Sequence, residues 1–375
     1  MIYLDNAATT KPSQTAVNNA LIYNETAFYN PSALYREGIK ASQLLKDAKN
    51  YILSTITSSK HDLIFTSCGT ESDNQAIFCA VKRGLFVTTK GEHSAVQKCF
   101  VELKNKNIST EFIDLNADGS VDEEKLYTFI KNNPNVTFVS IVHVNNETGA
   151  INDINKIAKN VKSINKDIIF HSDGVQAYGK IPFKLNEYVD LYSISAHKIN
   201  AFKGVGALIK KKGLNLSPYI FGGGQENGLR SGTENLFGIK VFEFAAKEHY
   251  TTIKNDFEYV KTLKTAFLDK IDKEIFTIIS NDNCSPYVIS VSAKGLKGEV
   301  IMHSLETEGI IVGNGSACSS KNPHSRVLEA CGYDTGVLSG VVRISFSNKT
   351  TLQEVEVAVE ALNNVAHKLK NIMGK

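Results

Sequence analysis

The sequence predicts an α/β fold with a mostly parallel sheet, joined to a smaller α+β unit. Apolar strand patterns alternate with helical patterns from about residue 60 to 210, which is typical of a parallel sheet with helices on both faces. A long helical pattern then runs from about Glu234 towards Leu268 and leads out of this region. The tail reads as helix, helix, strand and helix, which indicates the second, smaller unit.

Length and composition exclude several classes of protein. The chain has 375 residues, 42% hydrophobic and 22% charged, with a net charge of +3, an ordinary balance for a globular protein of two or three domains. The charge is too small to argue for nucleic acid binding. No apolar run is long enough to span a membrane and no signal peptide pattern is present, so we expect a cytoplasmic protein. The six cysteines and nine histidines form no CxxC or HExxH motif, so no metal site is predicted.

The elements before residue 80 include a strand–turn–helix unit. The opening IYLDNAATT reads as a short strand and a polar turn, and residues 31–56 show helical spacing of apolar residues. A strand is predicted over Leu63 to Thr66, followed by a turn with Gly69 and a helix from near Thr70, where Thr-x-x-Asp forms a capping box. The start of this helix is either an ordinary cap or a site for an anion such as phosphate.

Polar side chains follow the next two strands. A strand over Leu85 to Thr88 leads into GEHSAV and places His93 at a strand-to-helix turn, where it either stacks on a planar cofactor ring or is solvated. After a capped helix over Ser120 to Lys131, the apolar strand NVTFVSIVHV breaks at Asn145 and Asn146. Asparagine at such a strand end either hydrogen-bonds a ligand or makes a turn.

The stretch from Ile168 to Gly206 organises the rest of the chain. Two short apolar runs within it, Ile168 to Phe170 and Val189 to Ile194, are each followed by polar residues. These polar residues are Asp173, Gln176, Ser195, His197 and Lys198. Because parallel sheets bind ligands beyond the carboxyl ends of their strands, we expect Asp173 and Lys198 to face a shared crevice.

A carboxylate and a lysine in one crevice are used together in pyridoxal phosphate catalysis. The lysine forms a Schiff base with the cofactor aldehyde, and the aspartate keeps the pyridinium nitrogen protonated, so that the ring accepts electrons from a carbanion. Taken alone, Asp173 and Lys198 are also compatible with a solvated pair or with unrelated surface residues.

Two loops of small residues complete the pattern. YIFGGGQENGLRSGTEN allows close backbone approach but lacks the GK[ST] of a nucleotide-binding P-loop. GNGSACSSKNPHS carries Cys318 and is expected to be an exposed, mobile loop. Cys318 is therefore either a reactive thiol or an incidental surface cysteine, unlike Cys79 and Cys99, which lie within helical patterns.

Ten segments of the chain together resemble the NifS/IscS-type cysteine desulfurases, within the class V aminotransferase-like proteins that use pyridoxal phosphate. They are LDNAATT, GTESDN, EHSAV, VNNETG, SDGVQAYGK, SAHK, KGVGAL, GGGQENGLRSGTEN, GSACSS and VRIS, in the family's order. The resemblance implies the pyridoxal phosphate-dependent transferase fold of the aspartate aminotransferase type. Residues 15–255 would form the large domain, and residues 1–14 and 256–375 the small domain with the catalytic cysteine loop.

Carried over position by position, the resemblance implies a role for each residue around the cofactor ring. Lys198 would hold the cofactor as a Schiff base, and Asp173 would pair with the pyridine nitrogen. Gln176 would hydrogen-bond the ring hydroxyl and His93 would stack on the ring, with a part in catalysis. Asn145 would help to hold both cofactor and substrate.

The resemblance also implies the residues for the phosphate and the substrate. The cofactor phosphate would be bound by Gly69, Thr70, Ser195 and His197. In the family, the threonine that matches Thr233 reaches the phosphate from the other subunit, which implies a homodimer. Arg343 would clamp the substrate carboxylate with its planar guanidinium.

The implied reaction removes sulfur from L-cysteine and releases L-alanine. Lys198, once free, would act as general base at the substrate α-carbon. The thiolate of Cys318 would then attack the substrate sulfur and keep it as a persulfide for delivery to a sulfur-acceptor protein. The sequence leaves open whether that partner is an iron–sulfur cluster scaffold, a tRNA-thiolation enzyme or a thiamine-pathway carrier.

The chain departs from the family pattern in several places. Residues 199–202 (Ile-Asn-Ala-Phe) replace a tyrosine-glycine-proline run, Gly174 replaces a common alanine, and Cys68 replaces a common glycine. None of these changes removes a group with a named chemical role. The alternatives are a selenocysteine lyase, a class V aminotransferase or a non-catalytic cofactor-binding scaffold. Cys318 separates a desulfurase from an aminotransferase, since the latter needs no loop thiol.

Overall fold

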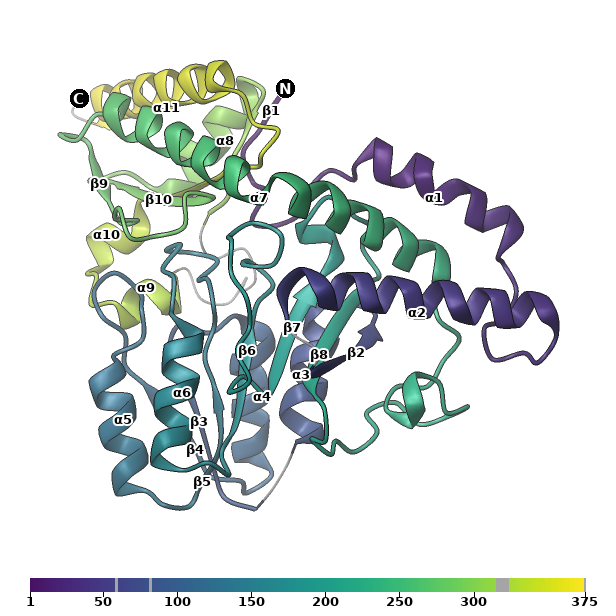
Figure 1. Ribbon diagram of the computed structural model, residues 1–375. Helices are drawn as coiled ribbons and strands as arrows, with labels where there is room; N and C mark the ends of the chain where they lie inside the picture. Colours follow the sequence, from purple (N-terminus) through teal and green to yellow (C-terminus); the bar gives the residue numbers. More distant parts are fainter. Residues whose placement is uncertain (58–59, 81–82, 315–323, 374–375) are drawn as a thin grey trace.

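The larger part of the molecule is built around a seven-stranded sheet. The computed structural model describes residues 1–57, 60–80, 83–314 and 324–373 (Figure 1). The strands are β2 (His61–Thr66), β3 (Leu85–Thr89), β4 (Thr110–Ile113), β5 (Val136–Ser140), β6 (Ile169–Asp173), β7 (Leu191–Ser195) and β8 (Gly206–Lys211). Their spatial order is β2-β8-β7-β6-β5-β3-β4. Strands β3 to β7 pair in parallel, whereas β8 is antiparallel to both β2 and β7. The predicted α/β fold with a mostly parallel sheet is confirmed.

Helices cover both faces of this sheet. Alternate residues of a strand point to opposite faces, so strands buried on both sides read as continuous apolar runs. One face packs against α3 (Gly69–Cys79) and α4 (Ser94–Asn105). The other face packs against α2 (Arg36–Ile56), α5 (Glu123–Asn132), α6 (Ile154–Ile164) and the first half of α7 (Leu236–Lys270). Helix α1 (Gln14–Thr26) lies on α7.

The smaller part has its own sheets and its own core. Strand β1 (Ile2–Tyr3) pairs in parallel with β11 (Ile310–Ile311). Strands β9 (Phe276–Ile278), β10 (Val288–Ala293) and β12 (Val341–Ser345) form an antiparallel sheet with β10 in the centre. The helices are α8 (Gly298–Thr307), α9 (Arg326–Ala330), α10 (Thr335–Ser339) and α11 (Leu352–Met373).

Helix α7 joins the two parts. In Figure 1 it runs from the larger part towards the smaller one, where α8 and α11 lie. Its first half contributes to the core under the large sheet, and its second half, from Val260 to Phe267, belongs to the core of the smaller part. The predicted domain limit at residue 255 falls inside this continuous helix, and the division into two domains stays a prediction.

Three local predictions are wrong. The capping box expected from Thr70 to Asp73 does not start α3, because the helix begins one residue earlier and Cys68 is its N-cap, with its sulfur accepting from the Glu71 N–H at 3.4 Å. The helix expected from residue 31 begins only at Arg36. The strand expected to reach Asn145 ends at Ser140, after which Val144 forms only an isolated bridge with Ile151.

Candidate active site

A pocket opens at the carboxyl edge of the large sheet, the edge at which such sheets bind ligands. It encloses about 540 Å³, including space open to solvent. Eight of the residues singled out from the sequence line it: Gly69, Thr70, His93, Asp173, Gln176, Ser195, His197 and Lys198. Cys68, Asp73, Val142, Val144, Asn146 and Val175 complete the wall. Residues far apart in the sequence therefore meet here, because each follows a strand that ends at the same edge.

One end of the pocket fits an anion. Helix α3 points its first turn at this end, and the N–H groups of a first turn have no partner within their own helix. The Ser195 hydroxyl is buried and has no hydrogen-bond partner among the described residues. A Cβ on Gly69 would lie 2.7 Å from Val175 Cγ2 and 3.3 Å from Ser195 Cβ, so only glycine leaves this space open. An orphan hydroxyl beside a helix start is suited to a phosphate group.

His197 forms the side of this anion site. Its Nδ1 lies 3.0 Å from the Thr9 hydroxyl oxygen, which holds the ring in place. Burial, followed by the positive charges of Lys198 and Lys203, lowers the pKa of His197 to about 4. The imidazole is therefore neutral at physiological pH, and it can offer a hydrogen bond to an anion without adding a charge.

The middle of the pocket holds an acid and an imidazole. Asp173 ends β6, and its Oδ1 accepts from the Val175 N–H at 2.9 Å. Burial raises the pKa of Asp173, while the charges of His93 and Lys198 act in the opposite direction. His93 is the N-cap of α4, where its Nδ1 accepts from Ala95 N–H at 3.2 Å, and burial lowers its pKa. A buried carboxylate in this position calls for a cationic partner, such as a protonated ring nitrogen.

Lys198 is held by the N-terminal turn. It lies in a short 3-10 helix after β7, and its Nζ donates to the carbonyl oxygens of Ala7 at 2.6 Å and Ala8 at 2.8 Å. The Gln176 side chain also donates to the Ala7 carbonyl, at 2.8 Å. The opening turn of the chain therefore fixes both the amine and the amide that line the pocket.

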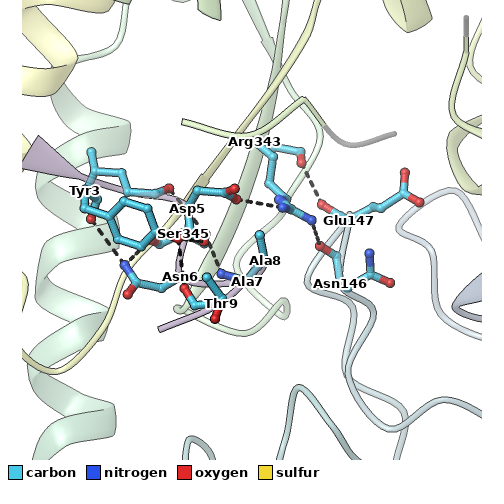
Figure 2. A network of polar contacts seen from close by, with 12 residues as sticks. Tyr3, Asp5, Asn6, Ala7, Ala8, Thr9, Asn146, Glu147, Arg343 and Ser345 are labelled. Carbon is cyan, nitrogen blue, oxygen red and sulfur yellow. Dashed lines mark hydrogen bonds and ion pairs between the residues drawn. The ribbon is translucent and has the colours of Figure 1, made fainter. Parts of the chain in front are cut away.

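Arg343 approaches the pocket from the smaller part. Figure 2 shows its guanidinium between the N-terminal turn and the loop at Asn146. Its Nη2 lies 2.7 Å from Asp5 Oδ1, and its Nη1 donates to the Asn146 carbonyl at 3.0 Å. Its Nε is buried and has no hydrogen-bond partner in the described part of the chain. Ser345, on the same strand, accepts from the Ala7 N–H at 2.8 Å, so the turn that holds Lys198 is fastened to the strand of Arg343.

Three predicted site residues that the structure describes, Asn145, Thr233 and Arg343, are not among the residues that line this pocket. Asn145 is buried behind it, with its side-chain oxygen accepting from the N–H groups of Glu147 and Thr148 and its NH₂ donating to the Gly91 carbonyl. The next residue, Asn146, faces the pocket instead. Thr233 is exposed on the loop before α7, and Cys318 lies outside the described residues.

Sequence reasoning also missed buried acids around the pocket. Burial, and then the nearby charge of Asp173, raise the pKa of Asp73 well above its ordinary value. Burial raises the pKa of Glu92 to about 8, although its Oε1 accepts from the Thr89 hydroxyl and the Val142 N–H. The acidic side chains of Asp73 in GTESD and Glu92 in GEHS could have signalled these groups, but only the fold shows that they are enclosed.

Two departures from the family pattern have a packing explanation. A Cβ on Gly174 would lie 1.9 Å from Cζ of Tyr192, so the tyrosine ring occupies the space that an alanine methyl would need. Ile199 and Ala201 are buried in the main core, and Phe202 packs on Phe237 with ring centroids 5.9 Å apart. Ile199, Ala201 and Phe202 therefore pack in or against the core beside Lys198, and the lysine stays in the pocket.

The described residues contain neither a metal-binding group of three or more His, Cys, Asp or Glu side chains nor a helix long and apolar enough to cross a membrane. A lysine, an aspartate and an anion cradle in one pocket are the groups with which enzymes of the pyridoxal phosphate class hold their cofactor. The chain matches the family model for aminotransferase class-V over residues 2–357. It belongs to this family.

Within this family, the chain is similar in sequence and structure to proteins of the NifS type, as three relatives illustrate. A protein named cysteine desulfurase from a Nostoc species is 34% identical over 381 residues, which cover 99% of this chain and 94% of the relative. A solved structure titled NifS-like protein superposes with a TM-score of 0.91 at 30% identity, covering 98% of this chain and 99% of the other. A structure titled SspA in complex with cysteine is 27% identical with a TM-score of 0.79, covering 94% and 100%. The resemblance to NifS-type cysteine desulfurases is confirmed.

Proposed function

We propose that this chain is a pyridoxal phosphate-dependent cysteine desulfurase. It removes sulfur from L-cysteine, releases L-alanine and carries the sulfur as a persulfide on Cys318. The observation that carries the proposal is the joint lining of one pocket by Lys198, Asp173, His93 and Ser195, in a chain that is 34% identical to a cysteine desulfurase over nearly its full length. The relative solved in complex with cysteine supports cysteine as the substrate.

The pocket residues fit the cofactor from end to end. Gly69, Thr70, Ser195 and His197 would hold the phosphate in the cradle at the start of α3, and Lys198 would bind the aldehyde carbon. When bound, pyridoxal phosphate supplies an electron sink that stabilises negative charge at the substrate α-carbon. Asp173 would hold the proton on the ring nitrogen by its charge, and His93 would cover one face of the ring.

The chain's own groups supply the remaining chemistry. Arg343 would bind the substrate carboxylate, because a planar guanidinium with N–H groups on one edge matches two carboxylate oxygens. The Lys198 amine would take the proton from the α-carbon, positioned by the carbonyls of Ala7 and Ala8. The Cys318 thiolate would then attack the substrate sulfur. A sulfur–sulfur bond forms as the carbon–sulfur bond breaks, and the three-carbon product takes up a proton and leaves as alanine.

A homodimer and a sulfur acceptor are part of the proposal. Thr233 is exposed and would complete the phosphate site of a second copy. Large apolar side chains are exposed on α1, on residues 28–39, which join α1 to the first turn of α2, and on the glycine-rich loop, a pattern that favours a protein interface. They are Leu21, Ile22, Phe28, Leu34, Tyr35, Ile39 and Phe221. In Figure 1 these three segments lie on the same side of the molecule. The acceptor would be an iron–sulfur cluster scaffold or a tRNA-thiolation enzyme, and the cytoplasmic location stays a prediction.

The decisive experiment measures sulfide and alanine released from L-cysteine in the presence of reductant. Native protein, Cys318→Ala and the control Cys331→Ala, which removes a buried thiol, are compared together with their cofactor absorbance. We expect the native chain and the control to release both products, and Cys318→Ala to keep the absorbance but lose release. Full activity of Cys318→Ala would favour a selenocysteine lyase or an aminotransferase. A native chain without cofactor absorbance would refute the role of Lys198.

A further inference from the structure

A second buried lysine stands beside the pocket without a role in the proposed reaction. Lys180 is only 4% exposed, although lysine is almost never buried without a reason. Lys180 lies four residues after Gln176, in the turn that follows β6. Its Nζ donates to Gln176 Oε1 at 2.8 Å. The side chain therefore ends at a pocket residue.

The contacts of Gln176 fix which way its amide points. A carbonyl oxygen can only accept, so the end of the amide that meets the Ala7 carbonyl at 2.8 Å must be the NH₂ group. The amide oxygen then faces Lys180, which donates to it. The same Ala7 carbonyl accepts from Lys198 Nζ at 2.6 Å. Lys180, Gln176, Ala7 and Lys198 thus form one continuous hydrogen-bonded row.

Lys180 acts in this row through its hydrogen bond more than through its charge. Burial, followed by the positive charges of Lys198 and Arg343, lowers the pKa of Lys180 to about 7. The other titratable groups that face it, His197 and His249, each have a pKa lowered to about 4, mainly by burial, and are neutral at pH 7. Above neutral pH the amine is therefore largely uncharged, yet it still has N–H groups to donate.

We propose that Lys180 is a positioning residue that locks the Gln176 amide, so that its NH₂ group faces both the Ala7 carbonyl and the pocket. The second N–H of that group is then held in place to donate to the ring oxygen of the bound cofactor. The inference rests on the proposed function, since it requires pyridoxal phosphate in the pocket. Without Lys180, the amide oxygen loses its partner and the amide can rotate away.

The test is an absorbance titration of the cofactor-loaded protein without substrate. A hydrogen bond to the ring oxygen favours the form in which this oxygen carries more negative charge, and so lowers the pH at which the bound cofactor loses its proton. We expect Lys180→Met and Gln176→Ala each to raise this pH by about one unit. The double variant should shift no further than Gln176→Ala alone, because Lys180 acts through Gln176. Lys180→Arg, which keeps a donor, should remain near the native value.

The matched control is Lys264→Met. Lys264 is also buried, but it lies in the smaller part and donates to the carbonyls of Asn281 and Cys284. The Lys264→Met variant should be less stable than the native protein, but its bound cofactor should lose its proton at the native pH. Shifts that add in the double variant, or an unshifted Lys180→Met, would overturn the proposal. If Lys180→Met does not fold, Lys180→Gln, one atom shorter and out of reach of Oε1, is measured against the same criteria. A native chain that shows no lysine-linked cofactor absorbance would refute the proposed function itself, and this inference with it.

Discussion

Replacing Gly174 by alanine should destabilise the protein even though alanine is common at this position in the family. The backbone of Gly174 does not have a positive φ, so alanine is acceptable there for conformational reasons. The obstacle is Tyr192, because the new Cβ would lie 1.9 Å from Cζ, 2.2 Å from the hydroxyl oxygen and 2.3 Å from Cε1. Contacts this short require the ring to move.

The ring has little room to move. Tyr192 is fully buried, its hydroxyl hydrogen-bonds His143 Nδ1 at 2.9 Å, and its ring packs on Phe183 with centroids 5.6 Å apart. Forcing an extra methyl into a packed core costs about 1–3 kcal/mol, and loss of the hydroxyl hydrogen bond adds about 1 kcal/mol. We therefore expect Gly174→Ala to lower the free energy of unfolding by about 2–4 kcal/mol.

Urea unfolding measures this change. The chain has no tryptophan, so tyrosine fluorescence and circular dichroism are followed together, and coincident curves establish that one transition is being compared. Gly336→Ala, at an exposed position of α10, is the control: its Cβ would meet only Asp334 Oδ1, at 3.1 Å, on an exposed side chain that can shift, so the free energy of unfolding should change little. Tyr192→Leu removes the three clashing atoms. The double variant Gly174→Ala/Tyr192→Leu should therefore lose less free energy of unfolding than the sum of the losses in the two single variants. A Gly174→Ala protein as stable as the parent would refute the reasoning.

Two further predictions concern charged groups. Asp5→Asn should lower the free energy of unfolding by about 2 kcal/mol, because it leaves the buried Arg343 cation without its carboxylate. The control is Asp114→Asn, which removes an exposed carboxylate; if Asp5→Asn loses no more stability to urea than this control, the prediction is wrong. Glu92, whose pKa burial raises to about 8, binds its proton more tightly in the folded than in the unfolded chain. The stability that it contributes is therefore complete below about pH 4 and is lost as the pH rises towards 8, by up to about 1.4 kcal/mol per pH unit. Glu92→Gln should flatten this decline between pH 6 and 8, and an equally steep decline in the variant would contradict the assignment.

The parts of the fold that could be predicted are those with strong apolar patterns. The strands before Asp173 and Ser195 and the long helix α7 follow from runs that only a buried element would carry. Helix α1 was missed because only Ala16 and Ala20 are buried on it, which leaves almost no apolar period. Strand β10 was missed because its serines are buried through contacts with distant loops, such as the hydrogen bond of Ser290 to the Glu147 carbonyl.

The candidate site shows a similar limit. Residues that directly follow strands, such as His93 and Lys198, could be assigned to the pocket because strand ends share one edge of the sheet. Which of two adjacent asparagines faces the pocket depends on the turn after Val144, where the amide of Asn145 is used by the backbone. Lys180 carried no signal of its own, since a lysine after glycine reads as a surface residue until burial is known.

The N-terminal turn also constrains the order in which the protein can be assembled. Asn6 and Ala7 hydrogen-bond Ser345 across 339 and 338 residues of sequence, and Lys198 reaches Ala7 across 191. A chain that emerges from the ribosome amino end first cannot form the two bonds to Ser345 until β12 has been synthesised. The N-terminal turn, although synthesised well before β12, is thus among the last segments to reach its native place, and such long-range closures slow folding. The turn that orients the Lys198 amine is therefore fastened only after β12 has been synthesised, so cofactor capture should follow synthesis of that strand.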